Sequence, residues 1–337
     1  MMSAAGHDDM TVESCISLGH PTEWNAALKG IKHAFAHTWE NCYAIHLSTG
    51  FPTYLYTFQK GDTRIVCPIA ERTFGGCTDI VTPYGFSGFA GNGPCPEFPL
   101  YWKNFVKAKG YVCGYIGLNP IFENSSYFEP DELYHYNNIY GLDLALTTDE
   151  LFANLSSNRK RQLKYWEKSF SKITVKDSAV IAFFVKEYHK FFKSRKFSST
   201  YNFSLETLSF LANVKNVFIA GVQNSGKIEA VSVFAYTPDA GDFLFNVSLD
   251  EGRKYSALLI WYGANYLKSM GVPFLNLGGG VRQNDGIATF KQRFGAKQFP
   301  LKCLKQVYES QVYDQLCRQN NADPNDRTGY FPPYQKP

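Results

Sequence analysis

The sequence lacks any apolar run that could cross a bilayer. Its longest clearly apolar run, Ala179–Val185, is far shorter than the roughly 20 residues that a spanning helix needs. The first ten residues include Asp8 and Asp9 and form no apolar leader, so we expect no signal peptide. These absences predict a cytoplasmic protein whose contact with the inner membrane surface, if there is any, is peripheral.

Standard nucleotide and metal motifs are also missing. The sequence contains no G-x-x-x-x-G-K-[ST], no H-E-x-x-H and no G-x-G-x-x-G. None of the eight cysteines forms C-x-x-C, so we interpret them as reduced thiols. His33 and His37 have helical spacing, but no cysteine or acid completes a ligand set, and we expect no metal site.

The chain has little net charge. Its 34 basic and 30 acidic residues give +4, which is too weak for a dedicated DNA-binding protein. An apolar content of 45% excludes wholesale disorder, and 337 residues predict two domains. The aromatic content of 16% predicts cores and clefts that are rich in rings.

The first third is punctuated by glycine and proline. Alternating patterns predict strands at 54–58 and 63–69 around a turn at Gly61, then a helix at 100–108 and strands at 111–118 and 136–144. A glycine-rich loop at 82–94 contains Tyr84, Phe86 and Phe89, which we expect to line a cleft, with packing into the core as the alternative.

The pattern changes near residue 147. A capping box at Thr147–Glu150 predicts one helix running through Phe170. The polar, proline-containing end, Asn320–Pro337, predicts an extended tail. Between them, the spacing predicts helices at 182–192, 204–211, 255–270 and 287–294 and strands at 217–222, 228–236, 243–248 and 274–277, an α+β order.

The segment 274–296, FLNLGGGVRQNDGIATFKQRFGA, is the most informative for chemistry. Glycines that follow a strand let the backbone approach a ligand closely. A lysine on the next helix, Lys291, can neutralise negative charge that develops in a reaction. A tight turn beside a surface lysine would give the same pattern.

This segment resembles the C-terminal signature of the FemAB-like branch of the GNAT acyltransferase superfamily. The signature has a leucine–asparagine–leucine–glycine strand, a small-residue loop, an aspartate–glycine pair, and a phenylalanine–lysine before a phenylalanine–glycine. The resemblance spans about residues 24–296. Weaker matches lie at 82–85, 118–120, 155–164, 195–197 and 261–271.

The resemblance implies tandem GNAT-like domains, each a mixed, mostly antiparallel sheet flanked by helices. We place the first at 1–146, with 303–337 returning to it, and the second at 147–302. The implied reaction is acyl transfer to an amine. The donor, aminoacyl-tRNA or acyl-CoA, is then a co-substrate, and no tightly bound cofactor is expected.

The resemblance also implies roles for single residues. Lys291 would assist the tetrahedral adduct, and Arg195 would contact the nucleotide diphosphate of the acceptor. On chemical grounds, and not from the resemblance, we expect Asp285 to orient Lys291 or to help take the amine proton, with a turn residue as the alternative. The remaining candidates are Tyr84, Asn276, Arg282 and Phe290 for the acceptor, and Arg159, Arg161, Arg253, Lys254 and Ser256 for the donor.

One position departs from the acyl-CoA-using relatives. Their pyrophosphate loop, Q/R-x-x-G-x-G/A, corresponds to Gly252–Ala257 here, and Tyr255 replaces the central glycine. We expect this bulky side chain to crowd a bound pyrophosphate, which disfavours ordinary acetyl-CoA binding. Arg253 and Lys254 remain available to another anion.

Residues 159–196 contain twelve lysines and arginines against three acids. Such a segment attracts a phosphate-rich partner, for example a tRNA, a nucleotide-sugar diphosphate or an anionic lipid carrier. Solvated helix faces are the alternative interpretation.

The favoured function is transfer of an aminoacyl group from tRNA to a primary amine of a nucleotide- or lipid-linked cell-envelope precursor. One alternative is an acyl-CoA-dependent N-acyltransferase acting on an amino sugar in polysaccharide biosynthesis. Another is a non-catalytic GNAT-like module that binds RNA or an anion. The sequence leaves the oligomeric state open.

Overall fold

The computed structural model describes residues 11–166, 172–194, 201–280 and 285–336, and it divides into two compact units. The first comprises residues 1–42, 51–135 and 302–337, and the second comprises residues 43–50 and 136–301. The boundary lies within strand β7 (Leu133–Asp143), earlier than the boundary that we expected after residue 146. Strand β13 (Lys297–Val307) leads back into the first unit. Because regular strands make these two crossings, and helix α2 (Trp39–Thr49) contains another, no linker composition marks them.

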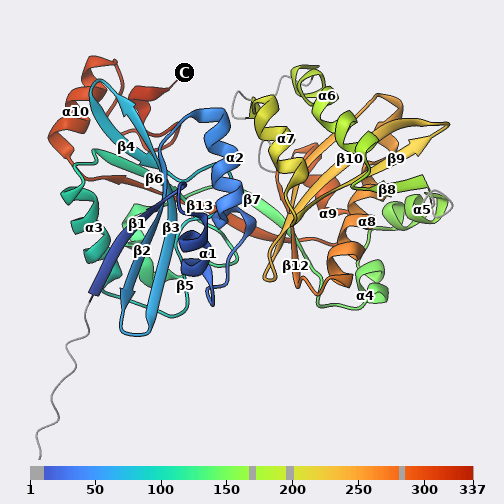
Figure 1. Cartoon of the computed structure of the whole chain (residues 1–337), viewed down its shortest axis with the longest axis horizontal. Helices are drawn as coiled ribbons and strands as arrows, with labels where there is room; N and C mark the ends of the chain where they lie inside the picture. The colour runs from blue at the N-terminus through green and yellow to red at the C-terminus, as the bar shows by residue number, and fades with distance from the viewer. Residues whose placement is uncertain (1–10, 167–171, 195–200, 281–284, 337) are drawn as a thin grey trace, which may run out of the picture. The chain divides into compact units, whose positions relative to one another are not determined.

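The first unit is built on a mixed sheet (Figure 1). Neighbouring strands are antiparallel except β4 and β6, which pair in parallel. The predicted hairpin turn is confirmed, with Gly61 at φ 55°. The order along the sheet is β1 (Thr11–Ser17), β2 (Thr53–Lys60), β3 (Thr63–Phe74), β4 (Cys77–Val81), β6 (Cys113–Gly117) and β13, while β5 (Ala90–Gly91) pairs with β3.

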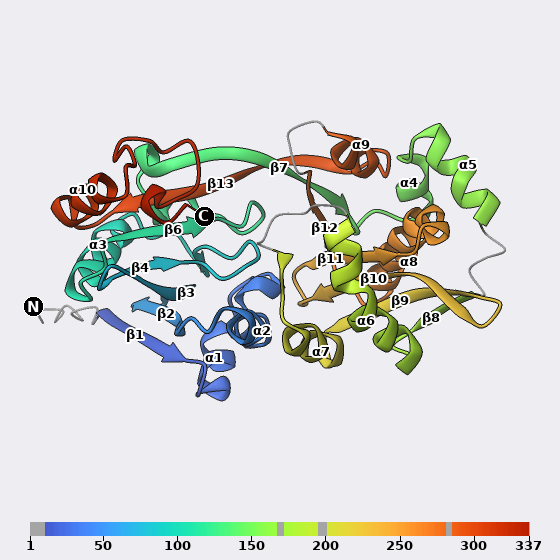
Figure 2. The ribbon, with the colours of Figure 1, turned by 90° about the horizontal axis from the view of Figure 1, so that it is seen from above.

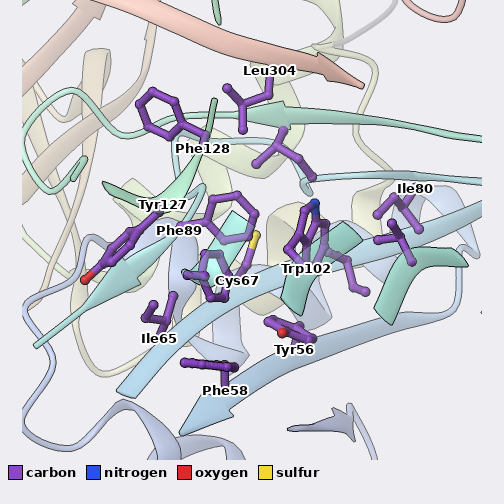
Figure 3. Packing of buried hydrophobic residues seen from close by; sticks show 14 of the residues in the cluster. Tyr56, Phe58, Ile65, Cys67, Ile80, Phe89, Trp102, Tyr127, Phe128 and Leu304 are labelled. Carbon is purple, nitrogen blue, oxygen red and sulfur yellow. The ribbon is translucent and has the colours of Figure 1, made fainter. Parts of the chain in front are cut away.

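An aromatic core fills this unit (Figure 3). The ring of Trp102, on helix α3, lies with its centroid 5.0 Å from the rings of both Tyr56 and Phe89. Phe89 is 2% exposed, so its predicted place in a cleft wall is wrong: the ring packs into the core. The helices of this unit are α1 (Pro21–Leu28), α3 (Phe98–Ala108) and α10 (Ser310–Gln319), and α2 (Trp39–Thr49) continues into the second unit.

The strands of the second unit also pair as a mixed sheet. All neighbours are antiparallel except β11 and β12, which pair in parallel. The predicted turn between β9 and β10 is confirmed by positive φ angles at Ser225 and Gly226. The order is β7, β12 (Phe274–Gly279), β11 (Gly241–Ser248), β10 (Lys227–Tyr236), β9 (Val217–Asn224) and β8 (Ile173–Val175).

Helices cover both faces of strands β9–β11 (Figure 2). On one face, Phe184 and Tyr188 of α6 pack against Phe245; on the other, Tyr266 of α8 packs against Phe218. The mixed sheet with flanking helices predicted for this half is confirmed. The helices are α4 (Thr148–Ala153), α5 (Ser157–Trp166), α6 (Ser178–Ser194), α7 (Leu205–Asn213), α8 (Ser256–Ser269) and α9 (Gly286–Gln292).

The predicted single helix from Thr147 to Phe170 is wrong. The capping box is present, but α4 ends at Ala153 and α5 begins at Ser157. Ser156 starts the second helix, because its Oγ accepts a hydrogen bond from the Arg159 amide at 3.3 Å. The end of the predicted helix, from residue 167, lies outside the described residues.

The predicted extended tail is also wrong. Residues 321–336 fold back onto α10, where Phe331 and Tyr334 are buried against Tyr313. Polar composition misled this prediction, because two aromatic side chains are enough to anchor the segment.

Candidate active site

The candidate site begins at the glycine-rich end of β12. Leu275 and Leu277 are buried in the core of the second unit, and they fix the strand. Gly278 then turns the chain with φ at 73°, a conformation that favours glycine. The register of β12 against β7 shifts here, between Asn276 and Gly279, and the carbonyl of Gly279 accepts a hydrogen bond from a side chain.

Lys291 uses this carbonyl. Its Nζ donates a hydrogen bond to the Gly279 oxygen at 2.6 Å, and its side chain, on α9, is only 7% exposed. Burial lowers the pKa of Lys291 to about 7, because an ammonium loses hydration there, while the charge of Asp285 acts in the opposite direction. An amine of this kind populates both protonation states near neutral pH.

Asp285 caps helix α9. Its carboxylate accepts a hydrogen bond from the Ala288 amide at 2.8 Å, which is the geometry of an N-cap. This contact bears out the turn-residue alternative, and its charge also favours the ammonium form of Lys291. A role in proton transfer stays a prediction.

Asn276 is enclosed by the strand ends. It is 4% exposed; its Nδ2 donates to Asp242 Oδ1 at 3.0 Å, and its Oδ1 accepts from the Gly278 amide at 2.7 Å. These contacts place the Asn276 side chain beneath the glycine turn. Sequence reasoning missed Asp242, which lies on another strand, because only the pairing of β11 with β12 brings it to Asn276.

Arg159 has a different environment from the one we predicted. Its guanidinium lies 4.5 Å and 4.3 Å from the ring centroids of Phe290 and Phe294, and it donates to the Phe290 carbonyl at 3.2 Å. The side chain is 2% exposed, and burial lowers its pKa to about 10. Arg159 therefore holds α9 in place from inside the domain. This corrects the expectation that Arg159 binds the acyl donor. The same contact covers one face of the Phe290 ring.

The start of α8 also differs from expectation. The Tyr255 ring is 3% exposed and packs with Leu258 and Leu259, so it does not project over the helix N-terminus. The expectation that Tyr255 crowds a pyrophosphate is therefore wrong. Arg253 and Lys254 are exposed on the preceding turn, where Arg253 pairs with Asp250.

The other predicted residues are spread along the chain. Tyr84 is half-buried in the first unit, where its carbonyl accepts a hydrogen bond from Asn41 at 3.0 Å. Arg161 is exposed on α5, and Ser256 begins α8. Arg195 and Arg282 lie outside the described residues. The structure thus brings together Lys291, Asp285, Asn276, Phe290 and Arg159 within the second unit.

Within residues 11–166, 172–194, 201–280 and 285–336, no three histidine, cysteine or acidic side chains converge as a metal site would require. In the same part of the chain, no helix combines the length and apolarity that crossing a membrane demands.

Comparisons with known proteins identify the fold. The structure is similar to that of FemX, with a TM-score of 0.65, 10% identity, and coverage of 90% of this chain and 99% of FemX. It is similar to the structure of L-PGS from Bacillus licheniformis (TM-score 0.56, 14% identity, 86% and 92% coverage). It also resembles the C-terminal domain of a putative lysylphosphatidylglycerol synthetase of Agrobacterium fabrum (TM-score 0.55, 13% identity, 89% and 96% coverage).

No protein-family model and no curated protein matches the sequence. The structural similarities confirm that the chain has the fold shared by FemX, L-PGS and the Agrobacterium fabrum domain, in agreement with the expected fold.

Proposed function

We propose that this protein is an acyltransferase that moves an aminoacyl group from tRNA to a primary amine of a nucleotide- or lipid-linked cell-envelope precursor. The observation that carries the proposal is Lys291, a buried lysine held to the Gly279 carbonyl at the end of β12. A fold shared with FemX and with the C-terminal domain of a putative lysylphosphatidylglycerol synthetase supports the substrate class.

In the proposed reaction, the lone pair of the acceptor amine attacks the ester carbonyl of the donor. A C–N bond forms, and the carbonyl oxygen becomes an oxyanion. The ammonium of Lys291 and nearby backbone amides stabilise this charge in a site from which water is largely excluded. The C–O bond to the ribose then breaks, and the proton lost by the amine balances the one gained by the ribose oxygen.

The test is transfer of labelled amino acids from a charged-tRNA pool to nucleotide- and lipid-linked peptidoglycan precursors. Lys291→Met should lower kcat by about 100-fold or more, the usual cost of losing an oxyanion donor. Lys297→Met, which changes an exposed lysine of the same unit, is the matched control and should keep full activity. Equal turnover in Lys291→Met and the wild type would remove Lys291 from the mechanism.

One observation favours a second candidate, an acyl-CoA-dependent N-acyltransferase. Because the Tyr255 ring is directed into the core, it does not block an anion at the start of α8. Calorimetric titration with CoA at low salt tests this candidate. Micromolar binding that Arg253→Ala weakens by about tenfold would favour acyl-CoA, whereas salt-sensitive binding of tRNA without CoA binding would favour aminoacyl transfer.

A further inference from the structure

The second unit places a carboxylate beside the predicted signature strand. Strands β11 and β12 pair in parallel, with Asp242 opposite Asn276. Their side chains meet in a hydrogen bond of 3.0 Å from Asn276 Nδ2 to Asp242 Oδ1. An ionised carboxylate only accepts hydrogen bonds, so Asp242 determines which end of the Asn276 amide faces it.

This orientation sets the glycine turn. With Nδ2 directed at Asp242, the Oδ1 of Asn276 faces the backbone and accepts from the Gly278 amide at 2.7 Å. If the Asn276 amide were flipped, its Nδ2 would face the N–H of Gly278. Two donors would then oppose each other, and the Gly278 N–H would lack its acceptor. Gly278 holds φ at 73°, and the next carbonyl, that of Gly279, receives the Lys291 ammonium at 2.6 Å.

We propose that Asp242 is a positioning residue for Lys291. Asp242 orients the Asn276 amide, and Asn276 holds the Gly278–Gly279 turn. The Gly279 carbonyl, which accepts from the Lys291 ammonium, is thereby kept in one position. This inference rests on the proposed function for its catalytic consequence, but the positional part can be measured without turnover.

The first experiment compares Asp242→Ala with Asp242→Asn in the full-length protein. Asp242→Ala should lower kcat by about tenfold or more with little change in KM, because the turn loses its anchor while the binding surfaces remain. Asp242→Asn should stay within about threefold of the wild type, because its amide oxygen still accepts from Asn276. Asp149→Asn, in an exposed position on α4, is the matched control.

A reciprocal exchange keeps the test decisive even if Asp242→Ala fails to fold. Asn276→Asp places two carboxylates together and should lose activity. The double variant Asp242→Asn/Asn276→Asp restores one donor and one acceptor, and residue 276 can still accept from the Gly278 amide. We expect this double variant to recover at least tenfold over the single variant.

A readout that does not depend on activity is the rate at which acetic anhydride labels Lys291, followed by mass spectrometry. Asp242→Ala should label several-fold faster than the wild type, whereas Asp149→Asn should not change. Wild-type rates in Asp242→Ala, or no recovery in the double variant, would overturn the inference. Absence of transfer by the wild type, together with faster labelling of Asp242→Ala, would overturn only the proposed function.

Discussion

At the scale of single residues, Lys291 and Arg159 show two ways of burying a cation. Arg159 packs against two aromatic rings and donates to a carbonyl near the end of α9, which suits a weakly hydrated guanidinium. Lys291 has a compact, strongly hydrated charge, and burial makes that charge costly. The first arrangement holds its cation by contacts that suit it, and the second keeps an amine whose pKa is lowered, at the expense of stability.

The cost at Lys291 predicts a dependence of stability on pH. The pKa of Lys291 falls from 10.5 in the unfolded chain to about 7 in the folded one, so the unfolded chain binds more protons between these values. The free energy of unfolding of the wild type, compared with that of Lys291→Met, should therefore increase between pH 7 and about 10.5. The increase should reach roughly 5 kcal/mol. Urea denaturation of both proteins across this range measures the difference, and parallel curves would show that the lysine is not buried as described.

At the scale of elements, sequence patterns predicted a helix start or a turn correctly where its geometry depends only on neighbouring residues. The Thr147 capping box and the turn at Ser225–Gly226 were predicted correctly, since each depends on neighbouring residues. The break between α4 and α5 escaped prediction, because Ser156 serves as an N-cap only once its own amide bonds to the distant Arg293 carbonyl. The sequence around a serine in a helical pattern does not show whether its amide will bond to a residue so far away.

The Ser156 side chain should make a measurable contribution to stability as the N-cap of α5. Ser156→Ala should lower the free energy of unfolding by about 1 kcal/mol, the usual loss when an N-cap side chain is removed. Ser157→Ala, one residue further and exposed, should leave it within about 0.5 kcal/mol. Chemical denaturation monitored by circular dichroism compares the two; equal effects would mean that Ser156 does not cap α5.

At the scale of the whole molecule, the chain returns at its end to complete the first unit. Lys305, which is buried, donates to the carbonyls of Arg327 and Gly329, and Gln335 donates to Asp79 of the buried Arg72–Asp79 pair. The amide of Gln335 thus donates a hydrogen bond to a carboxylate that lies 256 positions away in the sequence. The final segment is a structural part of the first unit.

Removal of residues 321–337 should destabilise the protein strongly. It would strip the acceptors from Lys305 and expose the apolar surface beneath Phe331 and Tyr334, at a cost of several kcal/mol, on the order of one buried charge and two aromatic rings. Removal of residues 336–337 alone is the control and should be nearly neutral. Thermal unfolding monitored by near-ultraviolet circular dichroism tests this, and a wild-type midpoint for the long truncation would contradict it.

The sequence by itself determined the fold class, most strands and helices, and the segment that carries Lys291, because these follow from local periodicity, turn residues and a motif contiguous in the chain. Only the tertiary structure decided which cations face solvent, where Tyr255 and Phe89 point, and that Asp242 meets Asn276. Burial and strand pairing depend on residues distant in sequence, and a side chain's chemistry is set by those neighbours as much as by its own type. The same lysine would be an ordinary surface cation without them.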